Sequence, residues 1–120
     1  DKPLGAFQAL AHNMADARTA LDGAKLLSYE AAWAHAQGHS LASLAPMAKT
    51  CACTSFRDTT AMAQQIFGGV GFTLEYDIQL YFKRARSTEI FLGDGAFHRE
   101  RLARLLLDSA APGQQREALA

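Results

Sequence analysis

Gln65-Ile66-Phe67-Gly68-Gly69-Val70-Gly71-Phe72 is the stretch that organises this chain. A long helical pattern ends at its first glycine, the usual residue just past the end of a helix. Backbone groups at such a bend have no side chain in front of them, which suits close approach of a flat ring or a pyrophosphate. Gln65, one turn earlier, offers both a donor and an acceptor. The bend lacks the strand-turn-helix setting of a dinucleotide-binding fingerprint, so taken alone it favours a simple turn.

Two long helices are predicted before the bend, because apolar residues recur there at steps of three and four. The first spans residues 4–37 and is ended by Gly38. The second spans residues 41–67, with Ser43 as its N-cap and Pro46 tolerated in its first turn. The apolar stripe of the first helix comprises Phe7, Leu10, Met14, Ala17, Leu21, Ala24, Leu27 and Ala31, and that of the second comprises Met47, Phe56, Met62 and Ile66.

Two shorter helices are predicted after the bend. Asp77 can cap a helix that continues to about Ala85, and a last helix begins near residue 94 or 95. Residues 111–120 read as a polar tail. No run of residues shows the period of two that marks a strand. The sequence therefore predicts an all-α domain over residues 1–110, an up-down bundle of four helices.

Composition excludes several classes of function. Twelve basic and twelve acidic residues balance, so nothing favours nucleic acid or an anionic membrane as a partner, and no run is long and apolar enough for a membrane span. Cys51 and Cys53 lie two apart on a predicted helix and point to different faces, which predicts reduced thiols in a cytoplasmic protein without a zinc site. Gly38 separates His35 from His39, so a metal-binding pair is not expected.

The run from Gly68 to Arg99 resembles the C-terminal helical domain of acyl-CoA dehydrogenases without a gap. The matching features are the glycine bend, then Glu75-Tyr76, a basic helix, and an Ile-aromatic-x-Gly segment at Ile90. Further landmarks upstream are Lys2-Pro3-Leu4, Phe7-Gln8, Ala31-Ala32-Trp33 and Met47-Ala48-Lys49. The resemblance covers roughly residues 1 to 108 and implies a fragment of a larger subunit, in which a helical domain and a β-domain precede this bundle.

The resemblance implies FAD as the cofactor of the full assembly. Gln65, Gly68 and Gly69 would contact the adenosine-pyrophosphate half of a flavin that belongs mainly to a neighbouring subunit. Asp94 stands where the family has a flavin-binding threonine, and its negative charge is unfavourable near a pyrophosphate. The resemblance further implies a tetramer that acts on acyl-CoA thioesters in fatty acid or steroid β-oxidation. This bundle alone should bind flavin weakly and be inactive, because affinity comes from many convergent contacts.

The catalytic base of the family has no counterpart in the matching segment. Acyl-CoA dehydrogenation needs a carboxylate that removes a proton from Cα while hydride leaves Cβ for the flavin. Most members supply it in an Ile-Tyr-Glu-Gly-Thr segment, which matches residues 90–94 here, and Leu92 stands at the glutamate position. Leucine cannot accept a proton. Phe91 and Gly93 of the same segment are the expected substrate contacts.

Three substitutes for the missing base remain open. Glu89 and Asp94 are weak candidates, and Glu89 is more readily explained by an ion pair with Lys83, Arg84 or Arg86. The base could also lie in an earlier domain, as in isovaleryl- and long-chain-type enzymes, although leucine is bulkier than the glycine or alanine they carry at this position. That arrangement would give a fully active homotetramer.

The remaining interpretation is a catalytically silent subunit. Leu92 together with Asp94 resembles actinobacterial steroid-degrading acyl-CoA dehydrogenases, α2β2 heterotetramers in which one subunit type lacks the glutamate. A non-enzymatic helical interaction module is the alternative from another class. Arg99 matches the arginine that follows the catalytic segment and is expected to order that loop through carbonyls or a carboxylate. Arg84 reverses the charge of a family aspartate, so a basic helix face is expected to be solvated or to meet an acidic partner.

Overall fold

The computed structural model describes residues 2–107, and all regular structure in this range is helical. The predicted all-α fold is confirmed. The polar tail at 111–120 and the last residues of the predicted domain lie outside the described residues. In chain order the elements are the 3-10 turn η1 (Leu4–Ala6), α1 (Gln8–Ala36), α2 (Leu44–Phe67), the 3-10 turn η2 (Gly68–Phe72), α3 (Ile78–Ile90) and α4 (Gly95–Leu107).

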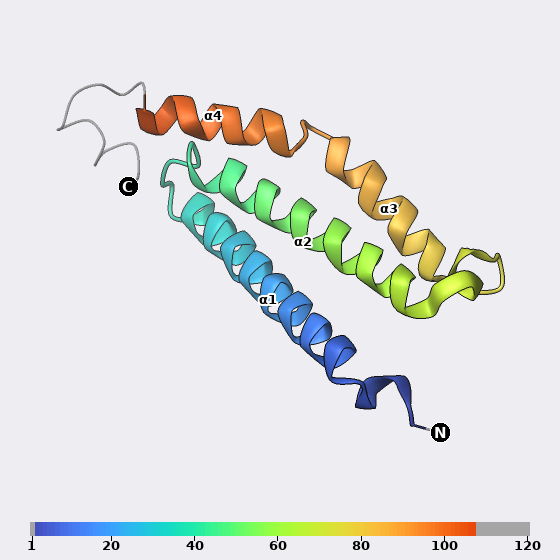
Figure 1. Cartoon of the computed structure of the whole chain (residues 1–120). Coiled ribbons are helices and arrows are strands. Elements are labelled where there is room, and N and C mark those ends of the chain that lie inside the picture. The colour runs from blue at the N-terminus through green and yellow to red at the C-terminus, as the bar shows by residue number, and fades with distance from the viewer. Residues whose placement is uncertain (1, 108–120) are drawn as a thin grey trace.

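Helix α2 is the centre of the bundle, and α1, α3 and α4 each pack against it. Helix α1 lies antiparallel to α2, while α3 covers the part of α2 near the glycine bend and α4 covers the other part (Figure 1). The chain turns through an angle between α3 and α4 but does not reverse, so both helices run opposite to α2 (Figure 1). The described part of the molecule is therefore elongated, with extents of 62 × 27 × 27 Å.

The helix boundaries follow the predicted glycines closely. Gly38 ends α1 with a φ of 77°, and Gly68 ends α2 with a φ of 64°; both lie in the left-handed region that glycine adopts at low cost. Ser43 precedes α2 as predicted, but its side chain forms no capping hydrogen bond. Helix α3 runs five residues beyond the predicted end at Ala85, because no glycine or proline interrupts it before Gly93.

The α1–α2 interface is built from small residues. Ala24 and Ala34 are buried on α1, and Ser55 is buried on α2. The Ser55 hydroxyl donates to the Ala20 carbonyl across the interface at 3.2 Å. Small side chains let two helices approach closely and leave few large apolar groups between them. The apolar stripe predicted on α1 is consequently only half covered, and its larger members Phe7, Met14 and Leu21 are 50, 41 and 38% exposed.

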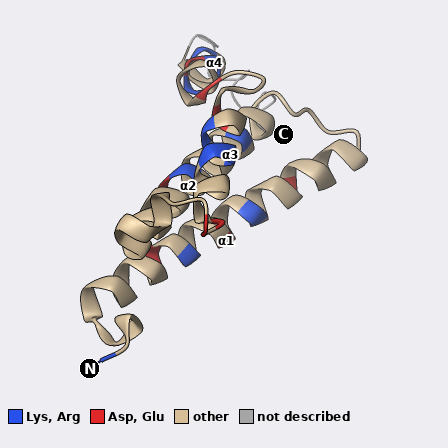
Figure 2. Ribbon diagram, turned by 90° about the vertical axis from the view of Figure 1, so that its right-hand side faces the viewer, with Lys and Arg blue, Asp and Glu red and all other residues tan. Residues whose placement is uncertain are grey.

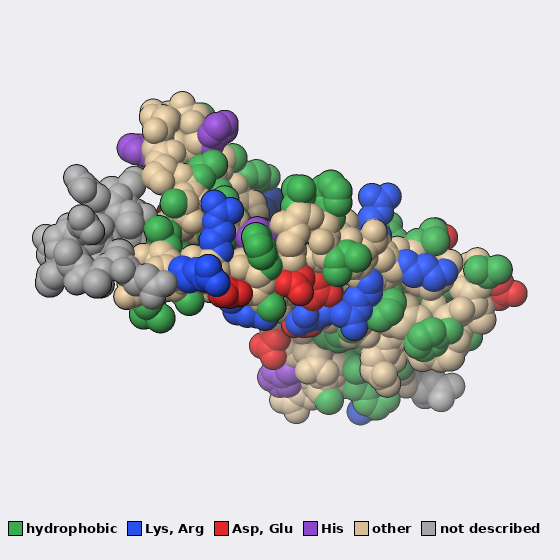
Figure 3. All heavy atoms as spheres, turned by 90° about the horizontal axis from the view of Figure 1, so that it is seen from above, with side chains coloured by type: hydrophobic (Ala, Val, Ile, Leu, Met, Phe, Trp, Pro, Cys, Tyr) green, Lys and Arg blue, Asp and Glu red, His purple; other side chains and the backbone are tan. Residues whose placement is uncertain are grey.

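Large apolar side chains remain on the surface of every α-helix. Hydrophobic side chains lie across the face seen in Figure 3, between acidic and basic groups. Leu26, Tyr29 and Trp33 follow one side of α1 and are 68, 62 and 59% exposed. Contiguous exposed apolar surface in a folded domain marks an interaction site. None of the described helices combines the length and the apolar character that a membrane crossing demands.

Candidate functional site

The predicted site residues fall into two groups at opposite ends of α3. The glycine bend, which comprises Gln65 and the η2 residues Gly68–Phe72, precedes α3. The α3–α4 turn, residues 90–94, follows it. A helix rises about 1.5 Å per residue, so the thirteen residues of α3 place the two groups roughly 20 Å apart. The structure therefore does not bring them into one pocket.

The outer side of the glycine bend is open. A Cβ placed on Gly68 or Gly69 would meet no atom within 4 Å, and Gln65 is exposed beside them. Gly71 differs, since a Cβ there would lie 2.8 Å from the Phe67 Cβ. The backbone at the first two glycines can thus be approached closely from outside, while the third glycine is needed for packing inside. This geometry fits a flat or phosphate-bearing group held at Gln65, Gly68 and Gly69.

Gln64 is a buried residue near the bend that no sequence pattern predicts. Its side chain is 4% exposed, and neither its Nε2 nor its Oε1 has a hydrogen-bond partner within residues 2–107. The Nε2 atom lies 3.1 Å from the position that a Cβ on Gly71 would occupy. The amide therefore fills the space beneath η2, where a glycine is required opposite it. No sequence pattern distinguishes it from its neighbour Gln65.

The α3–α4 turn presents apolar side chains to solvent. Ile90, Phe91 and Leu92 are 72, 67 and 77% exposed. Leu92 has a φ of 61° and is the sole non-glycine residue with positive φ among the described residues; Gly93 follows with a φ of 98°. The Gly93 amide donates to the Ile90 carbonyl at 3.3 Å and closes the turn. At the position where the resemblance places the base, this turn presents a side chain with no proton acceptor.

Glu89, the nearest carboxylate before Leu92, is held in an ion-pair network. Its two carboxylate oxygens lie 2.7 Å from Nη1 of Arg57 on α2 and 3.1 Å from Nη1 of Arg86 on α3. Of the three partners predicted for Glu89 on its own helix, Arg86 is the one that pairs with it. Arg57 could not be predicted, because it lies 32 residues away in sequence. The hydrogen bond from Arg57, followed by that from Arg86, lowers the pKa of Glu89. A general base at neutral pH requires the opposite shift.

Asp94, the nearest carboxylate after Leu92, caps α4. Its Oδ1 accepts a hydrogen bond from the Phe97 amide at 2.8 Å, the usual role of an N-cap aspartate. The Leu92 carbonyl is contacted by the Nε2 of His98 at 3.1 Å. The Arg99 side chain, expected to order this loop, forms no hydrogen bond or ion pair within residues 2–107 and lies against Gly95. The side-chain contact with a carbonyl of this turn is made by the neighbouring His98.

Several lysine and arginine residues lie along α3 (Figure 2). Lys83, Arg84 and Arg86 are all exposed. Arg86 bonds to Glu89 and lies over the Phe82 ring at 5.9 Å, and Lys83 donates to the Gln79 side chain. Arg84 makes no comparable side-chain hydrogen bond or ion pair among the described residues.

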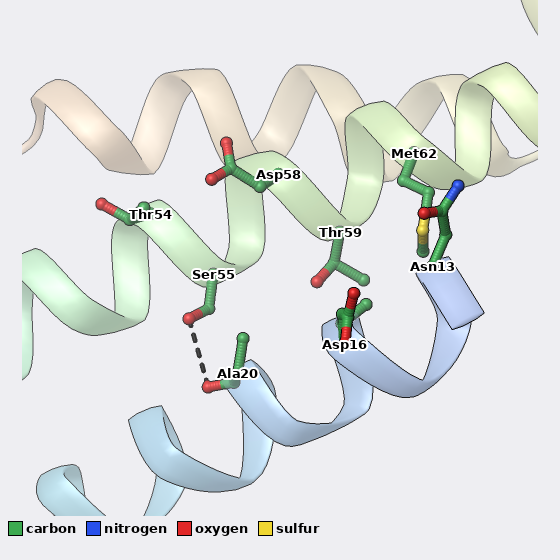
Figure 4. Close-up of a pocket in the computed structure, with 9 residues that line it drawn as sticks. Asn13, Asp16, Ala20, Thr54, Ser55, Asp58, Thr59 and Met62 are labelled. Atoms are coloured by element: carbon green, nitrogen blue, oxygen red, sulfur yellow. Dashed lines mark hydrogen bonds between the residues drawn. The ribbon is translucent and has the colours of Figure 1, made fainter.

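Two of the surface grooves differ in their relation to the predicted site residues. One, of about 270 Å³, borders the α3–α4 turn and is lined by Arg57, Glu89, Asp94 and Arg99 among others. A larger one, of about 370 Å³, lies between α1 and α2 and contains none of the predicted site residues (Figure 4). Both cysteines are free, and no group of three or more potential metal ligands occurs in the described range.

Comparison with protein families gives one match over most of the chain. The model described as "Acyl-CoA dehydrogenase, C-terminal domain" matches residues 1–107. A cyclohexane-1-carbonyl-CoA dehydrogenase of Geobacter metallireducens is 34% identical over 110 residues, which are 92% of this chain and 29% of that protein. The acyl-CoA dehydrogenase IpdE2 of Mycolicibacterium smegmatis is 36% identical over 104 residues, which are 87% of this chain and 31% of that protein. The chain thus spans about a third or less of these relatives.

Solved structures give the same fold. A chain described with the electron transferring flavoprotein of Acidaminococcus fermentans superposes with a TM-score of 0.83 at 36% identity, over 87% of this chain and 27% of that one. PigA in complex with FAD superposes with a TM-score of 0.81 at 26% identity, over 86% of this chain and 27% of that one. In both cases the similarity covers about a quarter of the longer chain.

Proposed function

This chain belongs to the acyl-CoA dehydrogenase family as its C-terminal domain, and we propose that it serves a flavin-dependent acyl-CoA dehydrogenase in assembly and in completing a flavin site, without supplying the catalytic base. The observation that carries the proposal is Leu92. It stands at the base position of the family, projects into solvent and cannot accept a proton.

The two carboxylates beside Leu92 support a silent site. Glu89 is held by Arg57 and Arg86, which lower its pKa, and Asp94 is engaged as the cap of α4. Either residue would have to abandon a contact within the bundle before it could reach a substrate. In such a dehydrogenase the base for the thioester would come from an earlier domain or from a partner subunit.

The glycine bend supports a contribution to FAD binding. FAD, when bound, accepts the hydride that leaves Cβ of the acyl group. Gln65, Gly68 and Gly69 would hold its adenosine-pyrophosphate half, because the open backbone allows close approach and the exposed amide offers a donor and an acceptor. Asp94 does not fit this group, since a carboxylate repels a pyrophosphate. The glycine bend and the α3–α4 turn lie roughly 20 Å apart, so each can contribute to a different binding site.

The exposed apolar surface supports assembly. Tyr29 and Trp33 on α1 and Phe91 at the α3–α4 turn are each more than half exposed. Aromatic residues dominate the energetics of protein interfaces, where they become buried. We therefore assign these surfaces to other domains or subunits of an oligomer that acts on acyl-CoA, in a homotetramer or an α2β2 heterotetramer.

Two alternatives make different predictions. An active homotetramer with its base in another domain would bind one flavin per subunit without a partner. A non-enzymatic helical module would bind none in any combination. The flavin content of the purified assembly distinguishes both alternatives from the silent subunit.

The test is to express the chain within its complete reading frame, alone and with a neighbouring acyl-CoA dehydrogenase, and to measure flavin per subunit by absorbance. Little flavin alone and about half a flavin per subunit with the partner is the expected result, because the base and most flavin contacts then come from the partner. One flavin per subunit alone supports the active homotetramer. Absence of flavin in every combination overturns the family function for this chain.

A further inference from the structure

The α3–α4 turn is fixed at both ends by contacts that do not involve the side chain of residue 92. At its start, Lys49 Nζ donates to the Thr88 carbonyl at 2.8 Å and Arg57 bonds to Glu89 at 2.7 Å, which ties the last turn of α3 to α2. At its end, Asp94 caps α4. The side chain of Leu92 itself is 77% exposed. The direction in which this side chain leaves the turn is therefore set by backbone geometry.

The backbone at Leu92 adopts a conformation that leucine disfavours. A φ of 61° brings Cβ of an L-residue close to the following carbonyl oxygen, a strain that glycine avoids. Such a conformation persists only where the surroundings impose it. Gly93 does not remove the strain at residue 92, because its own φ of 98° concerns the next pair of torsions.

His98 contacts the backbone of residue 92 directly. Its Nε2 lies 3.1 Å from the Leu92 carbonyl oxygen, and that oxygen can only accept, so the contact is a hydrogen bond when Nε2 carries the proton. The imidazole is held in place by an edge-on contact with Phe97, with ring centroids 5.2 Å apart and planes at 85°. Its Nδ1 is buried and has no partner among the described residues. The hydrogen bond to Leu92 is thus the one polar contact of this side chain within residues 2–107.

We infer that His98 is the positioning residue of the α3–α4 turn: by donating to the Leu92 carbonyl it selects the left-handed conformation of residue 92 and so sets the direction of the side chain at the base position. One consequence rests on the proposed function. The turn retains the shape needed to present a side chain there, and Leu92→Glu would present a carboxylate in the same direction.

The first experiment observes the backbone of residue 92 directly by NMR of this chain. In a NOESY spectrum, a residue with positive φ gives a strong cross-peak between its own amide and Hα protons, because the two protons are close together. We expect this peak in the wild type and in His98→Gln, whose amide N–H can replace Nε2, and we expect its loss in His98→Leu, with α4 still helical by its Cα shifts. Retention of the peak in His98→Leu, or its absence in the wild type, overturns the inference.

The second experiment uses a double-mutant cycle in thermal unfolding. Glycine adopts the left-handed conformation without help, so His98→Leu should lower Tm less in a Leu92→Gly background than in the wild type. If His98→Leu folds only in the Leu92→Gly background, that result also supports the inference. Equal decreases in both backgrounds, or failure to fold in both, assign His98 to packing of α4 and overturn the inference.

These outcomes are independent of flavin and of any partner. Leu92→Glu is expected to keep the left-handed cross-peak of residue 92. A Leu92→Glu assembly that keeps this peak but gains no dehydrogenase activity would count against the proposed base position and would leave the role of His98 standing.

Discussion

The Arg57 guanidinium lies 2.7 Å from the Glu89 carboxylate and joins the middle of α2 to the last turn of α3. The side chains of both residues are mostly covered, at 33 and 17% exposed. A partly covered ion pair loses less energy to solvent screening than a surface pair does. We therefore regard this pair as one of the main contacts that position the α3–α4 turn.

Removal of this pair should destabilise the chain. Arg57→Ala is expected to lower the free energy of unfolding by about 1 kcal/mol, because it leaves the mostly covered Glu89 with Arg86 alone, while the bond that Arg57 also makes to the exposed Asp58 adds little. Urea denaturation measures the change. Arg18→Ala is the matched control, since it removes an exposed pair with Asp22 on α1 and should leave stability unchanged within error. Equal effects of the two substitutions would contradict the special role of Arg57.

The contribution of Glu89 should depend on pH. Its folded-state pKa is lowered from an ordinary value of 4.5, so the carboxylate contributes stability above that value and loses it as pH falls through the lowered pKa. Glu89→Gln should accordingly be less stable than the wild type at neutral pH. The difference should shrink steadily in unfolding experiments below the ordinary carboxyl pKa. A difference that is constant down to acid pH would show that charge is not its cause.

Asp94 should contribute to stability through its cap. Asp94→Ala removes the acceptor for the Phe97 amide and is expected to cost about 1 kcal/mol. Asp94→Asn keeps an acceptor oxygen and should retain most of the stability. Thermal unfolding of the three proteins distinguishes the outcomes. If the asparagine variant is as unstable as the alanine variant, charge at the helix end matters more than the hydrogen bond.

Gly69 and Gly71 of the bend should tolerate substitution differently. A methyl group on Gly71 would lie 2.8 Å from Phe67 Cβ, and Gly71→Ala is expected to destabilise the chain by about 1–3 kcal/mol through overpacking. Gly69→Ala is the control, because nothing lies within 4 Å of its Cβ position. Calorimetry should give a normal Tm for the control and a lowered Tm for the other variant.

Gly69, which lies on the open side of the bend, should affect flavin binding by the assembled dehydrogenase but not the stability of this chain. Gly69→Leu is expected to leave the unfolding of this chain unchanged, since the side chain would enter open space. It should lower the flavin content of the assembled dehydrogenase, because it blocks the approach of a flat group to the bend. Gly5→Leu is the matched control, for its Cβ position is equally open and lies outside the bend. Undiminished flavin in the Gly69 variant would remove the bend from the cofactor site.

Most of the helix pattern could be predicted from the sequence because its signals are local. Gly38 and Gly68 stop helices wherever the rest of the chain lies, and the spacing of apolar residues indicates which face of α1 turns toward α2. The end of α3 was placed too early, at Ala85, because no glycine or proline marks the true end at Ile90. Lys49 and Arg57 reach that end from α2 and tie it down.

The sequence by itself determined the family, the order of the helices and the absence of a carboxylate at residue 92, because each of these depends on which residues occur and at what spacing. Only the tertiary structure decided how that position is built. Arg57 binds Glu89 across 32 residues of sequence, and His98 holds a backbone carbonyl that a sequence does not display. Contacts between segments are made in space, and the left-handed conformation of Leu92 exists because such contacts outweigh the local preference of leucine.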